Sequence, residues 1–358
     1  MSRRILHLIG QLERGGAERQ LLYLVEALQK RGWRGGILSF SRGEAWDDRA
    51  RALGVPLYFV PRTRHKWLRV ILVRAQIARF RPALCHSWSI HTNLYLDYAA
   101  RLWRGKTLYS FRYDPKTDAH TGQIAKIQYP AIYARTDCVI SNAAVSIESA
   151  RDAGIAMRRV EIIGNIVPLP PAPSERPMTI PRLAAIGLLI PRKGYDVLID
   201  ALGLLRAEGM IAELHLAGGG AEREALERQA RRQGVAEQVT FLGEIDTVPD
   251  LLQSAHILVH PSRAEGLSNT ILEGMAAGLP VVTTTAVGGE IIDHERTGLL
   301  VPPDDPAALA AALRRLIGDA HLRERLGQAA RAEIAARFAP DEVANQVEAI
   351  YTSLLENA

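Results

Sequence analysis

The stretch HILVHPSRAEGLSNTILEGMAAGLPVV, residues 256–282, contains a strand, a turn, a helix and the start of a second strand. HILVHP is an uninterrupted apolar run typical of a buried strand, and SRAEGL is the turn after it. Ser268 is a suitable N-cap for a helix near 269–277, which Gly278 and Pro280 end. A buried strand, a helix and another buried strand in this order are typical of a parallel sheet with crossover helices.

The same alternation extends in both directions along the chain. Before residue 168, strands are expected at RRILHLIG, GGILSF, PLYFV, ALCHSW, TLYSF and DCVIS, with helices at AERQLLYLVEALQKRG and at 66–80. After it, strands are expected at PRLAAIGLL, AELHLAGGG, QVTFLG and PVVTTT, with helices at 194–208 and 222–233 and further helices towards the end. This pattern predicts the α/β fold class.

A chain of 358 residues exceeds what one hydrophobic core usually supports, so two domains are expected. The boundary is predicted at NIVPLPPAPSERPMTIP, residues 165–181, because its six prolines favour a stiff, extended linker. We therefore expect two doubly wound, Rossmann-like domains, 1–168 and 169–339, that face each other across a cleft. Ligands of such domains bind at the carboxyl ends of the strands.

Charge is distributed unevenly along a chain of ordinary composition, with 47% hydrophobic and 23% charged residues. Residues 1–168 carry 27 Lys and Arg against 13 Asp and Glu, whereas residues 169–358 carry 17 against 26. A half with a net charge of +14 suits a phosphorylated substrate or an anionic membrane surface. Nucleic acid is not expected as a partner, because no nucleic-acid-binding module accompanies the charge.

Features of secretion and of membrane insertion are weak. The start, MSRRILHLIGQLERGG, is basic, but its apolar run ends at Gln11 and no cleavage site follows. No apolar run reaches the ~18 residues that a membrane-spanning helix needs. Cys85 and Cys138 lie in apolar contexts, which favour buried thiols in a reducing compartment over a disulfide. We therefore expect a cytoplasmic protein.

Two glycine turns after predicted strands could hold a phosphate. Gly15 and Gly16 in RGGAER allow close backbone approach at the start of a helix, although a plain structural turn fits equally. In PRKGYDVLIDAL, Arg192 and Lys193 precede a helix, where a cation could bind the oxygens of a diphosphate. The alternative is a solvated basic loop. LAGGGAERE repeats the strand, glycine and helix design.

Two carboxylates, Glu265 and Glu273, lie eight positions apart in the opening stretch. Glu265 falls in the turn, and Glu273 lies about five residues into the helix, on the face of Asn269. The Glu273 carboxylate could accept both hydrogen bonds of a ribose diol, and Glu265 could accept from sugar hydroxyls or stabilise a positive anomeric carbon. Each glutamate alone is more often a surface or cap residue, but the combination favours a nucleotide-sugar site.

EGLSNTILEGMAAGLPVV resembles the Glu-x7-Glu signature of retaining glycosyltransferase family 4, whose fold is the two-domain GT-B type. GGAER, PRKGYDVLIDAL, LAGGGAERE, VTFLGEID, HPSRAEG and GLLVPPDDP occur in the family's order and spacing, so the resemblance spans nearly the whole chain. It implies that the final helix, 340–358, crosses back to pack on the first domain.

The resemblance also implies roles for individual residues. Lys193 would bind the donor diphosphate, Glu265 the donor sugar and Glu273 the ribose. The remaining positions implied to bind the donor are Gly15, Gly16, Arg192, Gly243 with the backbone from Phe241, Gly266, Leu267, Ser268 and Asn269. Glu265, Lys193 and Arg112 are the implied catalytic residues.

Three departures from the family pattern stand out. Leu188 occupies the position of the usual arginine five residues before the lysine, and Arg192 could replace its charge from a different backbone position. Arg112 occupies the position where many members have a histidine near the anomeric centre. VGGEII is shorter than the usual loop, which leaves a role for Glu290 open.

The implied reaction moves a sugar from a nucleotide diphosphate to an acceptor hydroxyl with retained anomeric configuration. The leaving diphosphate can accept the acceptor's proton while Lys193, Arg192 and the helix N-terminus stabilise its charge. No Asp-x-Asp pair follows a strand as a metal site, so we expect a metal-independent enzyme without a cofactor. A uridine diphosphate donor and a role in cell-surface polysaccharide or glycolipid synthesis are expected from family frequency.

A saccharide or lipid-linked acceptor is expected to bind the basic first half. The candidate residues follow two strand ends, where packing roles are equally plausible: His86, Trp88, His91, Asn93 and Tyr113. Helix 66–80, with Trp67, could rest on an anionic membrane, or could be a packing helix with a basic outer side. Two rival functions remain open: a sugar-nucleotide epimerase, and a catalytically silent nucleotide-sugar binding protein.

Overall fold

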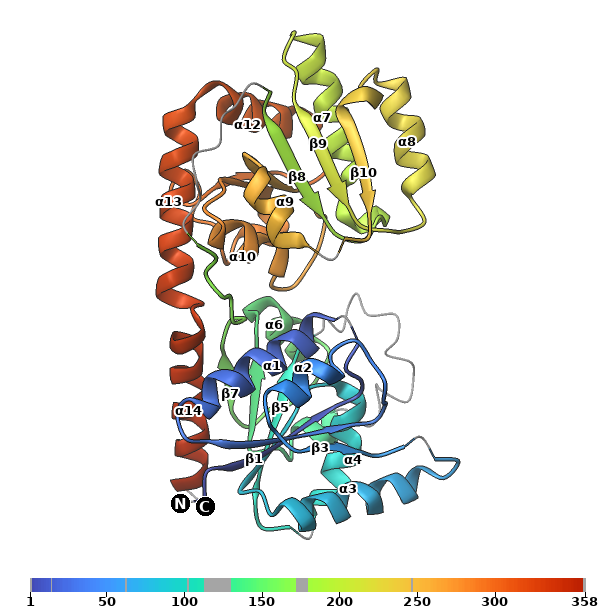
Figure 1. The fold of residues 1–358 in the computed structure, drawn as a ribbon, viewed down its shortest axis with the longest axis vertical. Coiled ribbons are helices and arrows are strands. Elements are labelled where there is room, and N and C mark those ends of the chain that lie inside the picture. Colours follow the sequence, from blue (N-terminus) through green and yellow to red (C-terminus); the bar gives the residue numbers. More distant parts are fainter. Residues whose placement is uncertain are drawn as a thin grey trace. The chain divides into compact units, whose positions relative to one another are not determined.

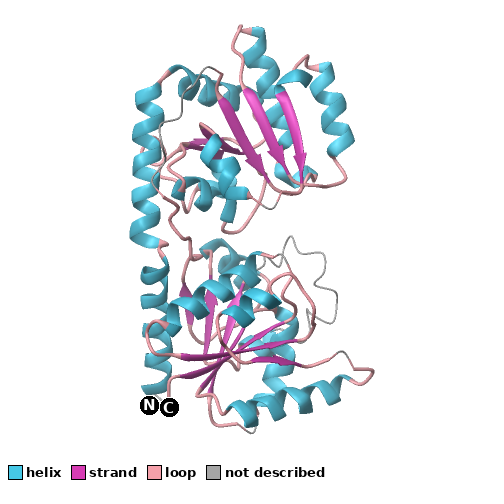
Figure 2. Cartoon of the chain, in the orientation of Figure 1, coloured by secondary structure: helices cyan, strands magenta, loops and turns pink. Residues whose placement is uncertain are grey.

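The computed structural model of the chain describes residues 2–13, 15–61, 63–101, 103–112, 130–171, 180–245 and 247–356. It consists of two compact units. The first unit is Met1–Ile166 together with Pro340–Ala358, and the second is Val167–Ala339. In each unit, strands form a sheet that helices flank (Figures 1 and 2).

The first unit is built on a parallel sheet with the strand order β3-β2-β1-β4-β5-β6-β7. Its strands are β1 (Arg4–Ile9), β2 (Arg34–Ser39), β3 (Leu57–Phe59), β4 (Leu84–Ser87), β5 (Lys106–Phe111), β6 (Cys138–Ser141) and β7 (Val160–Ile162). Its helices are α1 (Gly16–Gln29), α2 (Asp47–Ala52), α3 (Lys66–Phe80), α4 (Ile90–Ala100), α6 (Ala144–Asp152) and α14 (Pro340–Glu356).

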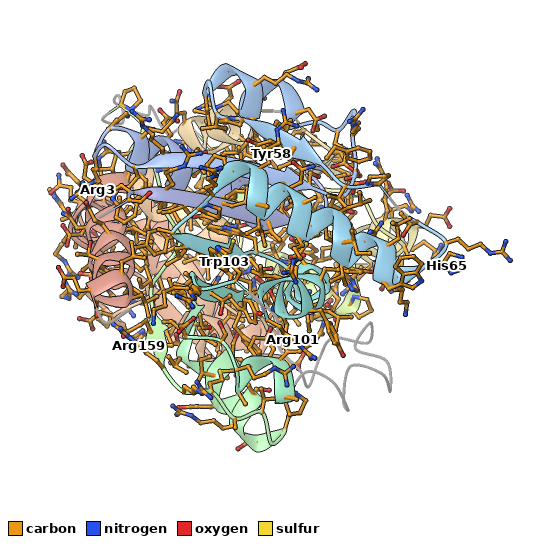
Figure 3. The ribbon with its side chains drawn as sticks, turned by 90° about the horizontal axis from the view of Figure 1, so that it is seen from below. Arg3, Tyr58, His65, Arg101, Trp103 and Arg159 are labelled. Atoms are coloured by element: carbon orange, nitrogen blue, oxygen red, sulfur yellow. The ribbon has the colours of Figure 1, made fainter. Side chains whose placement is uncertain are left out.

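Alternate residues of each strand fill two separate apolar layers in the first unit. Ile5 and Ile9 of β1 face a layer that α1 and α14 complete, whereas Leu6 and Leu8 face a layer that α3 and α4 complete. Tyr58 and Trp103 pack at the margin of the second layer, on the side shown in Figure 3. A strand that is buried on both faces needs a largely apolar sequence, and RILHLI of β1 has four apolar residues and one buried histidine after the half-buried Arg4.

The second unit repeats the plan with the strand order β10-β9-β8-β11-β12-β13, again parallel. Its strands are β8 (Arg182–Ile186), β9 (Glu213–Ala217), β10 (Val239–Gly243), β11 (Ile257–His260), β12 (Val281–Thr284) and β13 (Leu299–Val301). Its helices are η1 (Pro191–Lys193), α7 (Tyr195–Ala207), α8 (Arg223–Arg232), η2 (Ala236–Gln238), α9 (Val248–Ser254), α10 (Asn269–Ala276), α11 (Thr285–Gly288), α12 (Pro306–Gly318) and α13 (Ala320–Arg337).

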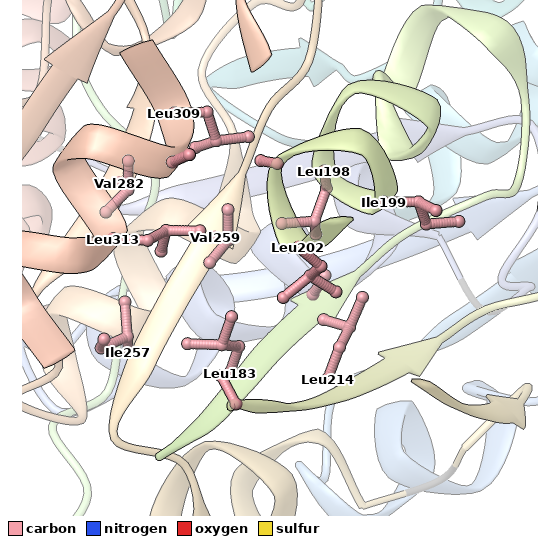
Figure 4. Packing of buried hydrophobic residues seen from close by; sticks show 14 of the residues in the cluster. Leu183, Leu198, Ile199, Leu202, Leu214, Ile257, Val259, Val282, Leu309 and Leu313 are labelled. Carbon is pink, nitrogen blue, oxygen red and sulfur yellow. The ribbon is translucent and has the colours of Figure 1, made fainter. Parts of the chain in front are cut away.

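Two apolar layers also enclose the second sheet. Ile257 and Val259 of β11 face α7 and α12 (Figure 4), whereas Leu258 faces α10 and α13. The chain reverses its strand order between β8 and β11, because β9 lies beyond β8 and β12 beyond β11. The loops that follow the adjacent strands β8 and β11 therefore lead away to opposite sides of the sheet. Doubly wound sheets bind ligands at such a point.

Most predicted elements are present, and α3 has the predicted bounds. The sequence did not predict β7, β13, α2, α4, α6, α9 or α11, and the two strands have only three residues each. Cys85 and Cys138 are buried free thiols, as predicted. Burial raises the pKa of the Cys138 thiol to about 12. Within the described ranges, no helix is both long and apolar enough to cross a membrane.

Close packing at Gly327 provides a test of the second unit's core. A Cβ at Gly327 in α13 would clash with the carbonyl oxygen of Gly278, whereas a Cβ at Gly318, the last residue of α12, would meet nothing within 4 Å. Alanine normally stabilises a helix by ~1 kcal/mol relative to glycine. We expect Gly327→Ala to lower the free energy of unfolding by about 1 to 3 kcal/mol, and Gly318→Ala not to lower it. Urea unfolding followed by circular dichroism measures both. Equal effects of the two substitutions would contradict the packing.

Candidate functional site

The candidate site lies at the carboxyl edge of the second sheet, where the loops after β8 and β11 pack on each other. The backbone N–H of Arg263 donates to the carbonyl of Arg192 at 2.8 Å. Gly194, at the start of α7, has φ +68°, and a Cβ there would clash with the carbonyl oxygen of Pro261. Glycine at 194 is therefore needed both for the left-handed backbone and for the close approach of the two loops.

Lys193 and Glu265 form an ion pair within this edge. The Lys193 ammonium contacts Oε1 of Glu265, and the two side chains are only 12% and 11% exposed. Two further groups hold the carboxylate: Nε2 of His260 lies 3.2 Å from Oε2, and the hydroxyl of Ser262 donates to Oε1 at 3.2 Å. The two residues that the sequence predicted for the diphosphate and the sugar are thus in direct contact.

The environment of Glu265 keeps its carboxyl group ionised. Burial by itself raises the pKa of a carboxyl group. The hydrogen bond from His260 and the electrostatic interactions with His260 and Lys193 outweigh burial, and the pKa of Glu265 falls from its ordinary 4.5 to about 2. A carboxylate that is charged at neutral pH can hold a hydroxyl group of a sugar or stabilise positive charge on a carbon.

Three residues of this cluster were not predicted from the sequence: His260, Ser262 and Arg263. His260 is the last residue of β11 and is fully buried, and its Nε2 also lies 3.2 Å from the hydroxyls of Ser262 and Ser268. Arg263 donates to Asp196 at 2.6 and 3.0 Å and to Asp304 at 2.6 Å, which ties the loop to α7. In the sequence, His260 could have been noticed as a polar residue at the end of the apolar run HILVHP.

Ser268 differs from its predicted role. It occupies the N-cap position of α10, but its side chain makes no capping hydrogen bond and contacts His260 instead. The next residues begin the helix as predicted, and Glu273 lies in its second turn and is half-buried. Gly266 is exposed, while Leu267 packs against the layer beneath α10. The donor contacts predicted for Gly266, Leu267, Asn269 and Glu273 remain predictions.

Neighbouring strand ends add further backbone at the same edge. The N–H of Gly218 after β9 donates to the carbonyl of Gly243 at 2.7 Å, and Gly243 at the end of β10 has φ +67°. Arg192 is exposed, and its guanidinium donates to the carbonyl of Ala264 at 3.2 Å. Leu188 is 57% exposed. Arg192 thus joins the two loops, and its predicted compensation for Leu188 remains a prediction.

In the first unit, the glycine turn after β1 contains an acidic side chain. Gly15 occupies the N-cap position of α1 and Gly16 is its first residue. A Cβ on Gly15 would clash with the carboxylate of Glu18. Burial raises the pKa of the Glu18 carboxyl group. The space that the sequence predicted for a phosphate oxygen at Gly15 therefore holds a carboxylate, and the predicted contact requires Glu18 to move.

The residues predicted for the acceptor have different environments. His86 and Trp88 are 1% and 3% exposed, and both ring nitrogens of His86 are used, by the Tyr351 hydroxyl at 2.6 Å and by Ser110 at 2.8 Å. These contacts favour the packing role that the sequence left open. Asn93 is also buried and donates to Tyr133 at 3.0 Å. His91 is exposed, and Tyr113 lies outside the described residues.

Arg112, the third predicted catalytic residue, follows the last residue of β5 and is half-buried. Its Nη1 donates to Oδ1 of Asn165 at 2.7 Å, and its guanidinium lies over the Trp88 ring at 4.8 Å. Arg112 thus belongs to the first unit, whereas Lys193 and Glu265 belong to the second. Among the described residues, no group of three or more His, Cys, Asp or Glu could hold a metal ion.

The low pKa of Glu265 predicts a pH-dependent contribution to stability. Because the folded protein lowers this pKa, the contribution is complete above about pH 4.5 and is lost as the pH falls towards about 2. We expect the difference in unfolding free energy between wild type and Glu265→Gln to shrink by roughly 2 kcal/mol from pH 6 to pH 3. Urea unfolding at each pH measures it. Glu224→Gln removes an exposed carboxylate of the same unit as a control, and the same pH dependence in both variants would contradict the assignment.

Two family models match the chain. The model described as Glycosyltransferase Family 4 matches residues 14–170, and the model described as Glycosyl transferases group 1 matches residues 180–319. The chain is 27% identical over 337 residues to the lipopolysaccharide core biosynthesis glycosyltransferase LpsE of Rhizobium meliloti, covering 92% of this chain and 93% of the relative. It is 28% identical to LpsD of the same organism, which bears the same description, covering 90% of this chain and 91% of LpsD.

The fold is also shared with a solved structure. The crystal structure of Anabaena Alr3699/HepE in complex with UDP superimposes with a TM-score of 0.85 at 22% identity, covering 98% of this chain and all of that one. Each family model matches one of the two sheet-forming halves, and the relatives match along nearly their whole length. The chain therefore belongs to glycosyltransferase family 4 and is a glycosyltransferase with the GT-B fold.

Proposed function

We propose that this glycosyltransferase moves a sugar from a uridine diphosphate donor to a hydroxyl of a saccharide or lipid-linked acceptor, with retention of the anomeric configuration. The observation that carries the proposal is the Lys193–Glu265 ion pair at the carboxyl edge of the second sheet. The relatives named for lipopolysaccharide core biosynthesis and the neighbour in complex with UDP support the acceptor class and the donor base. Cell-surface polysaccharide or glycolipid synthesis is the corresponding role.

The ion pair suits a site that binds and releases a diphosphate. Without a donor, Glu265 neutralises the Lys193 charge, so a buried ammonium is not left unpaired. A donor diphosphate would supply a second anion for Lys193 and would free part of the Glu265 carboxylate for sugar hydroxyls. Because α10 starts in the same loop, its first N–H groups add positive potential at this edge.

These groups can perform the transfer without a strong base. As the bond between the anomeric carbon and the diphosphate oxygen breaks, negative charge grows on the diphosphate and Lys193 stabilises it. The leaving diphosphate accepts the proton of the acceptor hydroxyl, and the hydroxyl oxygen bonds to the anomeric carbon on the same face. Since protein groups provide the positive charge, we propose that the reaction requires neither metal nor cofactor.

UDP binding and transfer test this proposal. We expect UDP to bind in calorimetry in the presence of EDTA, and a panel of UDP-sugars to raise the melting temperature by mass action. Glu273→Ala should weaken UDP binding by about 1 to 3 kcal/mol if the carboxylate holds the ribose. Glu224→Ala, at an exposed carboxylate of α8, is the matched control. Unchanged UDP affinity in Glu273→Ala would remove the ribose assignment.

Product analysis separates this function from its rivals. A transferase releases UDP at a rate that depends on an added acceptor extract. An epimerase consumes the UDP-sugar completely without any acceptor, and a silent binding protein binds UDP-sugar but transfers nothing to any extract. Restoration of activity by Mg²⁺ or Mn²⁺ after EDTA treatment would contradict metal independence.

We further propose that α3 rests on an anionic membrane face. The first half of α3 exposes Trp67 (62%) and Ile71 (51%), while the second half buries Val73 and Ile77. The sequence left a packing role open, and α3 has it in part, because Val70 and Leu72 also pack against the same layer. His65 lies at the outer end of the helix in Figure 3 and stacks on Trp67. Lys66 and Arg74 are exposed on the same helix, which suits anionic lipid.

Vesicle sedimentation tests the membrane contact. We expect binding to vesicles of phosphatidylglycerol and phosphatidylcholine, and loss of at least ~10-fold in affinity for the double variant Trp67→Ser, Ile71→Ser, because each side chain contributes ~2 kcal/mol when buried in the interface. Ile211→Ser, at a 58% exposed apolar residue of the second unit, is the control. Equal binding by the double variant and wild type would exclude α3 as the contact.

A further inference from the structure

We infer that the carboxyl edge of the first sheet carries an oxyanion site built on Arg112, and that it takes a phosphoryl group of the acceptor. The inference rests on the proposed function, because it names the chemistry of the acceptor that the enzyme would use. The donor diphosphate also contains phosphoryl groups. The experiment below therefore distinguishes binding of an acceptor phosphoryl group from binding of the donor diphosphate.

Among the described residues, Arg112 has no carboxylate partner. Two other arginines that side chains hold in place have carboxylate partners: Arg135 donates to Asp97 at 2.7 and 2.9 Å, and Arg263 to Asp196. In the described ranges, Arg112 contacts only neutral groups, the Asn165 carboxamide and the Trp88 ring. A half-buried positive charge without an anion is unfavourable, and a bound anion removes that cost.

The guanidinium of Arg112 uses only one of its nitrogens in hydrogen bonds to described residues. Nη1 is used by Asn165, whereas Nε is buried and has no hydrogen-bond partner in the described structure. Nη2 makes no hydrogen bond to any described residue either. Nε and Nη2 together form the edge of the guanidinium that binds two oxygens of a phosphoryl group at once. The group that would occupy this edge is therefore a bidentate oxyanion.

The residues around Arg112 hold it rigidly. Asn165 is 2% exposed, and Oδ1 of Asn165 also accepts from Asn142 at 3.4 Å. Trp88 is fixed by the hydrogen bond from its Nε1 to Nδ1 of His7 at 3.2 Å. Burial lowers the pKa of His7 to about 3, so His7 stays neutral and can accept this bond at physiological pH. A rigid guanidinium loses little entropy when an anion binds.

Arg112 also keeps its charge in this environment. Burial lowers the pKa of the guanidinium from 12.5 to about 10, which still leaves it protonated at neutral pH. Its position directly after β5 places it at the edge of the sheet where doubly wound folds bind ligands. It belongs to the first unit, whose net charge suits an anionic acceptor, whereas the proposed diphosphate lysine belongs to the second.

Phosphate binding to the full-length protein saturated with UDP tests this site, because UDP occupies the donor groups. We expect inorganic phosphate to bind in calorimetry, and Arg112→Gln to weaken that binding about 10- to 100-fold, the usual effect of a lost charge-assisted pair. Arg112→Lys keeps the charge but not the two-pronged edge, so it should restore binding only in part. Arg159→Gln removes another arginine of the first unit, one paired with Glu161, and should stay within about twofold.

Asn165→Asp is a second variant that leaves Arg112 in place. It would put a carboxylate 2.7 Å from Nη1 with almost no change in shape. We expect it to weaken phosphate binding as much as Arg112→Gln does, because the new carboxylate at position 165 would neutralise the charge of Arg112. This variant keeps the test valid even if Arg112→Gln does not fold.

The outcomes separate the sources and the proposals. Unchanged phosphate binding by Arg112→Gln and Asn165→Asp would overturn the site. A loss of UDP affinity in Arg112→Gln as large as in Lys193→Ala would assign Arg112 to the donor and would also overturn it. If wild-type protein does not bind UDP, the proposed function fails, and phosphate titration of Lys193→Ala protein without UDP then decides the Arg112 site separately.

Discussion

A buried ion pair fixes the edge of the second sheet. Lys193 and Glu265 come from loops that follow β8 and β11, and neither charge could be buried alone without a large desolvation cost. His260 and Ser262 are further hydrogen-bond partners of the two carboxylate oxygens of Glu265. The pair therefore requires both loops to adopt one arrangement, and Gly194 allows it because a Cβ would clash with Pro261. The conformation and the charge of both loops therefore depend on this contact.

The elements that the sequence predicted well are those whose pattern is local. The bounds of α3 follow from its own periodicity, and the strand–turn–helix order around Glu265 follows from apolar runs, an N-cap residue and a terminal glycine. The three-residue strands β7 and β13 were missed because so short a run carries no periodicity, whereas the equally short β3 was predicted from the longer apolar run PLYFV. Their position in the sheet comes from pairing with β6 and β12.

The roles of polar residues were harder to predict because their partners are distant in sequence. His86 pairs with Tyr351, 265 residues away, and this contact between β4 and α14 makes it a packing residue. Ser268 has the sequence of an N-cap, yet its hydroxyl contacts His260, since a buried imidazole nitrogen beside it also needs partners. Glu18 fills the space over Gly15, only three residues before it in the chain. The two glycines of RGGAER gave no indication of this contact.

Charge counts likewise do not say which cations are available to a ligand. In the second unit, Arg263, Arg314 and Arg315 each have carboxylate partners within 3 Å, and Lys193 is neutralised by Glu265. In the first unit, Arg112 is held by an amide and an indole, which fix its direction without reducing its charge. An arginine of the first kind stabilises the fold, because its field is cancelled at short range. An arginine such as Arg112 still attracts an anion, because its neutral neighbours fix its orientation and leave its charge uncancelled.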